Sequence, residues 1–368
     1  MQARRSSGYL LFAGSSHRTL AEDISRRIGQ PLADAEFTKA EDGETSIEVG
    51  DSVRGKDVFI IQTGSGTSVN DHIMEMLILA YACKTSSARR IVGVLPYLPY
   101  SRQSKLRNRG CIAAKLLASM MTKAGLTHVI TIDLHHKEIQ GFFDVPVDNL
   151  RASAFIMEYI KDNVPNYHNA VIVARHPGVT YRASSYAERM HLRIAVIHGQ
   201  KEAEPDYDDE NYGRSSSPPP FIDEEPEEPT TIVIPPHVRR KRNDSTVKVK
   251  PSLYCVGDVQ GRIAIIVDDV IDEVGELIAA AECLKENGAY KIYAAATHGI
   301  LSKDSPELLD QSPIDEVLIT NTVPTQDQEC RCKKIKTIDI SILLAEAVRR
   351  IYNGESMSYL FRNIPMEQ

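Results

Sequence analysis

The sequence predicts an α/β fold in which two similarly built lobes each contain a mostly parallel sheet flanked by helices. Three observations lead to this prediction. Short runs rich in β-branched residues alternate with helical patterns in both halves of the chain, these runs are apolar throughout rather than at every second position, and 368 residues suffice for two domains.

Eight runs are the candidate strands. Their continuous apolar character is typical of strands that are covered on both faces, as in a parallel sheet. They span residues 9–13, 57–62, 90–95, 128–132, 170–174, 263–267, 291–297 and 316–320.

Two segments between these runs have the helical period. Residues 277–284 predict a helix that Asn287 and Gly288 end before the strand at 291. Residues 73–81 predict another helix, buried on most sides, because apolar residues occupy two stripes. One stripe holds Ile73, Met76, Leu77 and Ala80, and the other holds Met74, Ile78 and Tyr81.

The composition changes abruptly at residues 201–250, which hold 8 of the 19 prolines and twelve acidic against eight basic residues. Such a segment buries too little apolar surface to offset its ordering entropy, so we expect a disordered insertion. We interpret its basic cluster at 239–242 as solvated charge, with a nuclear-import or phosphate-binding patch as the alternative. The expected domains are 8–150 and 151–310 with this insertion, and residues 311–368 complete the lobes with a strand, a helix and a tail.

The charge balance excludes some classes of protein. The chain has 43 basic and 50 acidic residues, for a net charge of −7. A general nucleic-acid binder needs a basic surface to neutralise phosphates, so we expect no nucleic-acid partner, although a small anionic substrate stays open. No run approaches the roughly 18 apolar residues that span a bilayer, so we expect no membrane association and a cytoplasmic location.

Polar residues that directly follow the strands are the first candidates for a site, because ligands of open α/β sheets bind at the carboxyl ends of strands. After the run at 128–132 come Asp133 and His135, followed by Asp144 and Asp148. Three carboxylates and an imidazole can hold a hydrated Mg²⁺ and phosphate oxygens. A structural turn is the alternative interpretation of the same pattern.

The strand at 263–267 ends in acids and then turns tightly into a helix. This order is typical of sites that hold ribose hydroxyls with carboxylates and a 5′-phosphate at a helix N-terminus. Acids that complement a helix dipole explain Glu273 and Glu276 equally well. The residues concerned are Asp268, Asp269, Asp272, Glu273, Gly275 and Glu276.

The segment 96–109 joins aromatic residues to four basic side chains, and its prolines predict a loop. Such a loop can receive a nucleotide polyphosphate, and Arg102 and Gln103 are its central candidates.

Taken together, these motifs closely resemble those of the ribose-phosphate pyrophosphokinases, or PRPP synthetases, over nearly all of the chain outside 201–250. The resemblance implies two tandem phosphoribosyltransferase-like domains. It also implies transfer of the β,γ-diphosphoryl group of ATP to the 1-hydroxyl of ribose 5-phosphate with Mg²⁺. The motifs lie at 12–17, 42–44, 48–55, 102–103, 133–148, 267–269 and 353–361.

The resemblance assigns roles where the residues match. Asp42 and Glu44 are similar to the nucleotide-binding loop of the synthetases, and Arg102 and Gln103 match their ATP-binding pair. Asp133 and His135 match ligands of Mg²⁺ and phosphate. However, Ala40 stands where the synthetases place an aromatic residue against adenine, and such stacking contributes about 1–3 kcal/mol in comparable sites.

Three segments depart from the synthetase pattern. Residues 175–182 replace P-D-A-G-G-A-K-R with R-H-P-G-V-T-Y-R, and Asp272-Glu273-Val274-Gly275-Glu276 replaces D-T-C-G-T. Two carboxylates there would repel a phosphate dianion. The catalytic loop expected after residues 195–198 offers only Lys201 as a remnant of its Lys and Arg, and phosphoryl-type transfer depends on such cations.

We therefore expect a non-catalytic regulatory member of the family, similar to the PRPP synthetase-associated proteins. Its partners are catalytic synthetase subunits and further copies of itself, with Mg²⁺ bound weakly or lost and ATP or ADP as candidate ligands. Surfaces that resemble assembly or regulatory elements include Ser52, Arg54, Ser356 and Ser358. An active synthetase is the main alternative, and a phosphoribosyltransferase that uses PRPP is the third.

Overall fold

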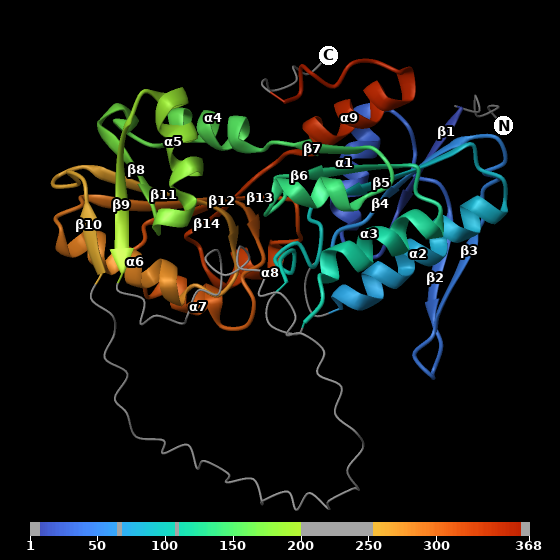
Figure 1. The fold of residues 1–368 in the computed structure, drawn as a ribbon, viewed down its shortest axis with the longest axis horizontal. Helices are drawn as coiled ribbons and strands as arrows, with labels where there is room; N and C mark the ends of the chain where they lie inside the picture. Colours follow the sequence, from blue (N-terminus) through green and yellow to red (C-terminus); the bar gives the residue numbers. More distant parts are fainter. Residues whose placement is uncertain (1–7, 65–67, 107–109, 200–252, 362–368) are drawn as a thin grey trace, which may run out of the picture. The chain divides into compact units, whose positions relative to one another are not determined.

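A computed structural model describes residues 8–64, 68–106, 110–199 and 253–361 (Figure 1). The expected insertion at 201–250, Lys201 and the end of the basic loop at 107–109 lie outside the described residues. Among the described helices, none is long and apolar enough to cross a membrane.

The first sheet contains five strands in the order β1-β4-β5-β6-β7, and each neighbouring pair is parallel. Its strands are β1 (Tyr9–Ala13), β4 (Asp57–Ile61), β5 (Arg90–Leu95), β6 (His128–Ile132) and β7 (Val147–Leu150). A separate antiparallel hairpin joins β2 (Ala35–Lys39) to β3 (Thr45–Val49).

The second sheet contains seven strands in the order β10-β9-β8-β11-β12-β13-β14. The pairs from β9 to β14 are parallel. Its strands are β8 (Ala170–Ala174), β9 (Arg193–Gly199), β10 (Leu253–Val256), β11 (Ile263–Ile271), β12 (Lys291–Gly299), β13 (Glu316–Thr320) and β14 (Ile335–Ile338). The expected α/β class with two mostly parallel sheets is confirmed.

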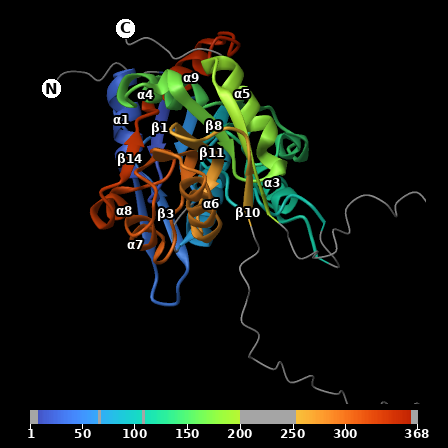
Figure 2. The same ribbon diagram turned by 90° about the vertical axis from the view of Figure 1, so that its left-hand side faces the viewer.

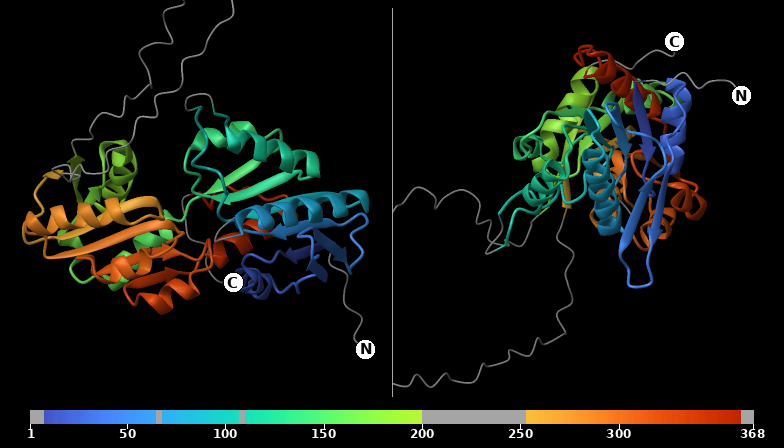
Figure 3. Two further views of the ribbon diagram at one scale, coloured as in Figure 1. Left: turned by 90° about the horizontal axis from the view of Figure 1, so that it is seen from below. Right: turned by 90° about the vertical axis from the view of Figure 1, so that its right-hand side faces the viewer.

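Helices cover both faces of each sheet. On the first sheet, α1 (Arg18–Ile28) and α9 (Ser341–Asn353) pack together on one face, and α2 (Val69–Thr85) lies beside α3 (Ala113–Ala124) on the other (Figures 1 and 3). On the second sheet, α4 and α5 lie opposite α6 and α7 (Figure 2). The remaining helices are α4 (Ser153–Asn163), α5 (Thr180–Met190), α6 (Gly275–Glu286), α7 (Ser305–Asp310) and α8 (Gln326–Arg331).

All eight expected strands are present, and β11 and β12 continue a few residues further than expected. The expected helices at 73–81 and 277–284 correspond to α2 and α6. One expectation was wrong: the stripe with Met74 and Tyr81 is not buried, since these side chains are 46% and 57% exposed. The last segment of the chain serves both sheets, because β13 and β14 extend the second sheet while α9 packs on α1.

A buried seam of hydrogen bonds joins the ends of the two sheets. The Nε2 of His17 lies 3.1 Å from the carbonyl oxygen of Asn321, and the hydroxyl of Thr63 donates to the carbonyl of Thr322 at 2.9 Å. The Nε2 of His298 donates to the carbonyl of Ile132 at 3.1 Å. These side chains are buried, so each bond replaces water that the polar atoms have lost.

The seam needs its histidines to be neutral. The Nδ1 of His17 accepts a hydrogen bond from the Leu20 N–H at the start of α1, while Nε2 points at Asn321. Burial lowers the pKa of His17 to about 4, and burial also lowers the pKa of His298. Protonation would break the Nδ1 contact and leave a buried charge.

We predict that the protein loses stability as the pH falls from about 6.5 towards 4. In this range His17 binds a proton in the unfolded state but stays neutral in the folded state. Between pH 7.5 and pH 5, His17 alone should account for about 2 kcal/mol of lost unfolding free energy. Urea unfolding at the two pH values measures this loss. In His17→Asn, which retains an acceptor for the helix start, the loss should shrink by that amount; an unchanged loss would exclude His17 as its source.

Candidate functional site

The acids at the carboxyl end of β11 lie at the centre of the candidate site. Asp268 and Asp269 are 6% and 2% exposed, so both carboxylates have lost most of their water. Arg175 directly follows the neighbouring strand β8, and its Nη2 lies 2.8 Å from Oδ2 of Asp268. Its Nη1 lies 3.3 Å from Oε2 of Glu276 in the first turn of α6.

The second acid is paired with the first lobe. The Nδ1 of His135, just beyond β6, lies 2.6 Å from Oδ2 of Asp269. The Nη2 of Arg182, on α5, lies 3.6 Å from Oδ1 of the same carboxylate. Burial would raise the pKa of Asp269, but the His135 hydrogen bond and the Arg182 charge hold it well below its usual range. Burial raises the pKa of Asp268 to about 6, although Arg175 opposes this shift.

Asp272 also pairs across the two lobes. The Nη2 of Arg102 lies 2.5 Å from Oδ2 of Asp272, and the hydroxyl of Ser302 donates to Oδ1 at 2.5 Å. Partial burial raises the pKa of Asp272, but these hydrogen bonds more than offset that effect and keep it below its usual range. Arg102, predicted to bind nucleotide, thus already has a carboxylate partner from the predicted ribose-phosphate loop.

The other predicted nucleotide-binding residues are exposed. Asp42 and Glu44 lie at the turn of the β2–β3 hairpin, where the Glu44 N–H donates to Oδ1 of Asp42 at 3.0 Å. Gln103 is exposed in the turn after Arg102. No hydrogen bond or ion pair within the described ranges connects the hairpin turn to Arg102 or Gln103. The structure therefore brings Arg102 to the acids but does not gather the four residues into one site.

The four residues predicted to bind Mg²⁺ are also divided. The Oδ2 of Asp133 accepts hydrogen bonds from the Ala152 N–H at 2.9 Å and from the Thr297 hydroxyl at 2.8 Å. Asp148 pairs with His128 at 2.8 Å, while Asp144 is exposed. Across the described residues, no group of three or more His, Cys, Asp and Glu side chains is placed to hold one metal ion. Asp133 and Asp148 thus already have hydrogen-bond partners within the chain, and a shared Mg²⁺ site of Asp133, His135, Asp144 and Asp148 stays a prediction.

The two loops that depart from the synthetase pattern present groups that do not favour phosphate. Glu273 and Glu276 are exposed where α6 begins at Gly275, so a phosphate at this N-terminus would meet both carboxylates. In the other loop, residues 177–179 form a 3₁₀ turn before α5, and Tyr181 is exposed with Nζ of Lys137 5.0 Å from its ring centre.

A cavity of about 400 Å³ lies apart from these acids. Its lining combines two cations and two amides with one aromatic ring, a set of donors suited to an anion with an attached planar group. The residues are Lys137, Gln140, Asn149, Arg151 and Phe361. This cavity was not predicted from the sequence, although the Asp133–Asp148 motif contains two of its residues, Lys137 and Gln140.

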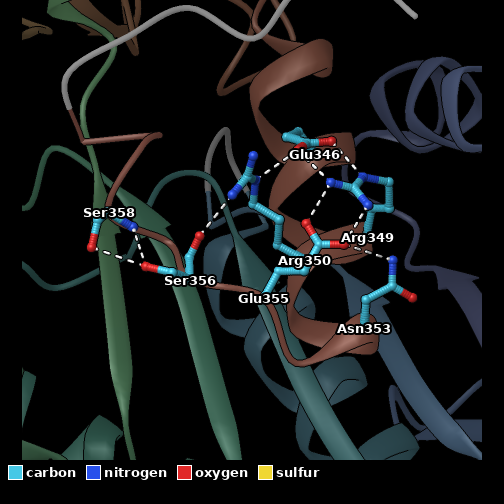
Figure 4. A network of polar contacts seen from close by, with 7 residues as sticks. All are labelled: Glu346, Arg349, Arg350, Asn353, Glu355, Ser356 and Ser358. Carbon is cyan, nitrogen blue, oxygen red and sulfur yellow. Dashed lines mark hydrogen bonds and ion pairs between the residues drawn. The ribbon is translucent and has the colours of Figure 1, made fainter.

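The tail that leads to Phe361 is fixed by α9 (Figure 4). The Nη1 of Arg350 donates to the carbonyl of Ser356 at 2.8 Å, and the Ser356 and Ser358 hydroxyls are 3.0 Å apart. Glu346 holds Arg350 through Nε at 2.6 Å. By contrast, Ser52 and Arg54 lie in an exposed turn, and within the described residues no hydrogen bond or ion pair joins them to the tail.

Two residues of the site were not predicted from the sequence as functional, namely Arg175 and Arg182. The sequence feature that could have indicated them is the altered segment 175–182, which begins with an arginine at the position of the synthetase proline. The sequence could not show that this arginine reaches both Asp268 and Glu276, because these three residues come from three different elements.

Comparisons with known proteins give consistent matches. Residues 9–125 match the N-terminal domain of ribose phosphate pyrophosphokinase, and residues 166–362 match the phosphoribosyl synthetase-associated domain. The chain is 54% identical to phosphoribosyl pyrophosphate synthase-associated protein 1 of Mus musculus over 100% of both chains. It is 53% identical to associated protein 2 of Homo sapiens over 98% of this chain and 95% of that one.

Two further matches concern the synthetases. The chain is 42% identical to ribose-phosphate pyrophosphokinase 2 of Schizosaccharomyces pombe, over 98% of this chain and 99% of that one. Its fold matches the crystal structure of phosphoribosylpyrophosphate synthetase from Mycobacterium smegmatis with a TM-score of 0.77 and 30% identity. That match covers 95% of this chain and all of the other.

We predict that Asp133 is a structural residue and that Asp144 is not. Asp133→Ala removes two hydrogen bonds and leaves the Ala152 N–H and the Thr297 hydroxyl without their acceptor, which should lower the unfolding free energy by about 2–3 kcal/mol. Asp144→Ala, the matched control, should change it by less than about 0.5 kcal/mol. Urea unfolding with and without Mg²⁺ tests both. Stabilisation of the wild type by Mg²⁺ that disappears in both variants would instead indicate a shared metal site.

Proposed function

The chain belongs to the ribose-phosphate pyrophosphokinase (PRPP synthetase) family, and from this premise we propose that it is a non-catalytic regulatory subunit of a PRPP synthetase complex. In this role it modulates the synthesis of 5-phosphoribosyl 1-diphosphate for nucleotide biosynthesis. Its proposed partners are catalytic synthetase subunits and further copies of itself, in the cytoplasm.

One observation carries the proposal: the acids at the end of β11 already have partners within the chain. Asp268 pairs with Arg175, Asp269 with His135 and Arg182, and Asp272 with Arg102. A substrate would have to break these pairs before it could use the carboxylates or Arg102. Each broken pair would leave a poorly hydrated charge, which costs free energy that binding must supply.

The relatives support the regulatory part of the proposal. The mouse and human relatives, at 54% and 53% identity, are named as proteins associated with the phosphoribosyl pyrophosphate synthase. The match covers both lobes, so this chain has the same helices and strands as its relatives from which to form assembly surfaces. We propose that Mg²⁺ binds weakly or not at all and that ATP or ADP binding is weakened by the absence of an aromatic residue at position 40.

An active ribose-phosphate diphosphokinase, which converts ATP and ribose 5-phosphate to AMP and PRPP, is the alternative. It is favoured by 42% identity to a pyrophosphokinase of S. pombe and by six retained residues, namely Arg102, Gln103, Asp133, His135, Asp268 and Asp269.

We predict that the purified chain forms no PRPP or AMP from ATP, ribose 5-phosphate and Mg²⁺. It should co-purify with a catalytic synthetase and change the rate of that enzyme. The assay measures AMP and PRPP for the chain alone, for the synthetase alone and for the two mixed. Steady product formation by the isolated chain would contradict the proposal and favour the alternative, and an unchanged rate without co-purification would reject the regulatory role.

The cavity beside the tail is our candidate for the regulatory ligand, with inorganic phosphate as the first probe. Lys137 and Arg151 supply positive charge, and Gln140 and Asn149 supply amide donors. Arg151→Ala removes one charged donor and should weaken phosphate binding by about tenfold or more. The control Arg193→Ala, at an exposed pair with Asp258, should have no effect.

Thermal unfolding at increasing phosphate concentration measures this affinity, because a ligand that binds only the folded state raises the midpoint. The unfolding midpoints of the wild type and Arg193→Ala should rise equally with phosphate concentration, and the midpoint of Arg151→Ala should rise less. If all three proteins respond equally, phosphate binds elsewhere.

A further inference from the structure

Arg175 bridges two carboxylates that come from different elements of the second lobe, an arrangement that a divalent cation can also bridge. Its two terminal nitrogens lie 2.8 Å from Asp268 and 3.3 Å from Glu276. The guanidinium comes from the end of β8, and its partners come from the end of β11 and the first turn of α6. Hard divalent cations bind through this type of carboxylate set, with oxygen ligands converging from different elements.

Burial makes a counter-charge necessary at this position. Asp268 is 6% exposed, and the side chain of Arg175 is 22% exposed. An isolated carboxylate with so little water is strongly unfavourable, and a cation offsets that cost whether it is a metal ion or a guanidinium. Arg175 supplies this charge from within the chain.

The surrounding charges oppose the entry of a second cation. Arg182 and His135 already contact Asp269, and Arg102 contacts Asp272. A divalent ion at Asp268 would lie near the positive charges of Arg182 and Arg102 and would have to displace Arg175 from both of its partners. Like charges at such separations repel strongly where water is scarce.

We propose that Arg175 is a built-in cation that occupies the acid site at the end of β11, so that this site is neutralised without a divalent metal ion. The motif comparison adds to this proposal, because the synthetase pattern has proline, with no charge, at the position of Arg175. The chain thus carries a positive charge at a position where the synthetase pattern has an uncharged residue, which leaves the acids available to a ligand.

The substitution Arg175→Met tests the proposal with little risk to folding. Methionine retains an unbranched apolar stem, and Nε of Arg175 is buried with no hydrogen-bond partner, so the change also removes an unsatisfied donor. Asp268 and Glu276 then lose their internal cation and become available to a metal ion.

The experiment titrates Mn²⁺ alone into each protein and measures free Mn²⁺ by electron paramagnetic resonance. We expect Arg175→Met to bind Mn²⁺ at least tenfold more tightly than the wild type. The control Arg193→Met should resemble the wild type, because Asp258 retains Arg262 as a partner. The double variant Arg175→Met with Glu276→Gln should lose the gain, since one of the two bridged carboxylates is gone.

Two results would overturn the proposal: equal Mn²⁺ affinity in the wild type and Arg175→Met, or a gain that persists in the double variant. If Arg175→Met is unfolded without metal, circular dichroism with added Mn²⁺ decides the question. Recovery of the native spectrum supports the proposal, and a spectrum that stays unfolded rejects it. The readout is cation binding by the isolated chain, so a failure here is distinguished from a failure of the proposed regulatory role, which product formation and co-purification with a synthetase measure.

Discussion

A buried carboxylate at the end of a strand must be matched by a positive charge, and the rest of this site follows from that constraint. Asp268 and Asp269 lie among the last residues of β11, which ends at Ile271, and have almost no contact with water. Arg175, Arg182 and His135 reach them from three other parts of the chain. Once these pairs form, the loops after β6 and β8 and the start of α5 have fixed positions. In an enzyme of this family such acids are expected to be available to substrate, whereas here they are paired with side chains of the chain itself.

The same polar atoms that close the site also join the two sheets. His135, Asp133 and Arg102 belong to the first lobe, and their partners Asp269, Thr297 and Asp272 belong to the second. The buried seam of His17, Thr63 and His298 adds contacts between strand ends. A regulatory subunit benefits from this arrangement, because its surfaces keep one geometry without a substrate in place. Residues that a synthetase would use for ligands are here used to hold the lobes together.

The sequence was sufficient for the fold because the central strands are continuously apolar. It missed the β2–β3 hairpin, whose alternating residues are only half-buried, and short edge strands such as β14. It overestimated the burial of α2, since Met74 and Tyr81 are apolar yet exposed. In the site, it identified Asp268, Asp269 and Asp272 from their place after a strand. It could not identify their partners, because ion pairs such as Arg175–Glu276 join residues that are far apart in the sequence.

The central claim is that the chain's own cations occupy the acids at the end of β11. A crystal structure of the protein grown with Mg²⁺, ATP and ribose 5-phosphate tests it most directly. The account predicts Arg175 between Asp268 and Glu276, Arg102 on Asp272, and no substrate or metal at the end of β11. Electron density for ribose 5-phosphate or Mg²⁺ on Asp268 and Asp269, with Arg175 displaced, would contradict it.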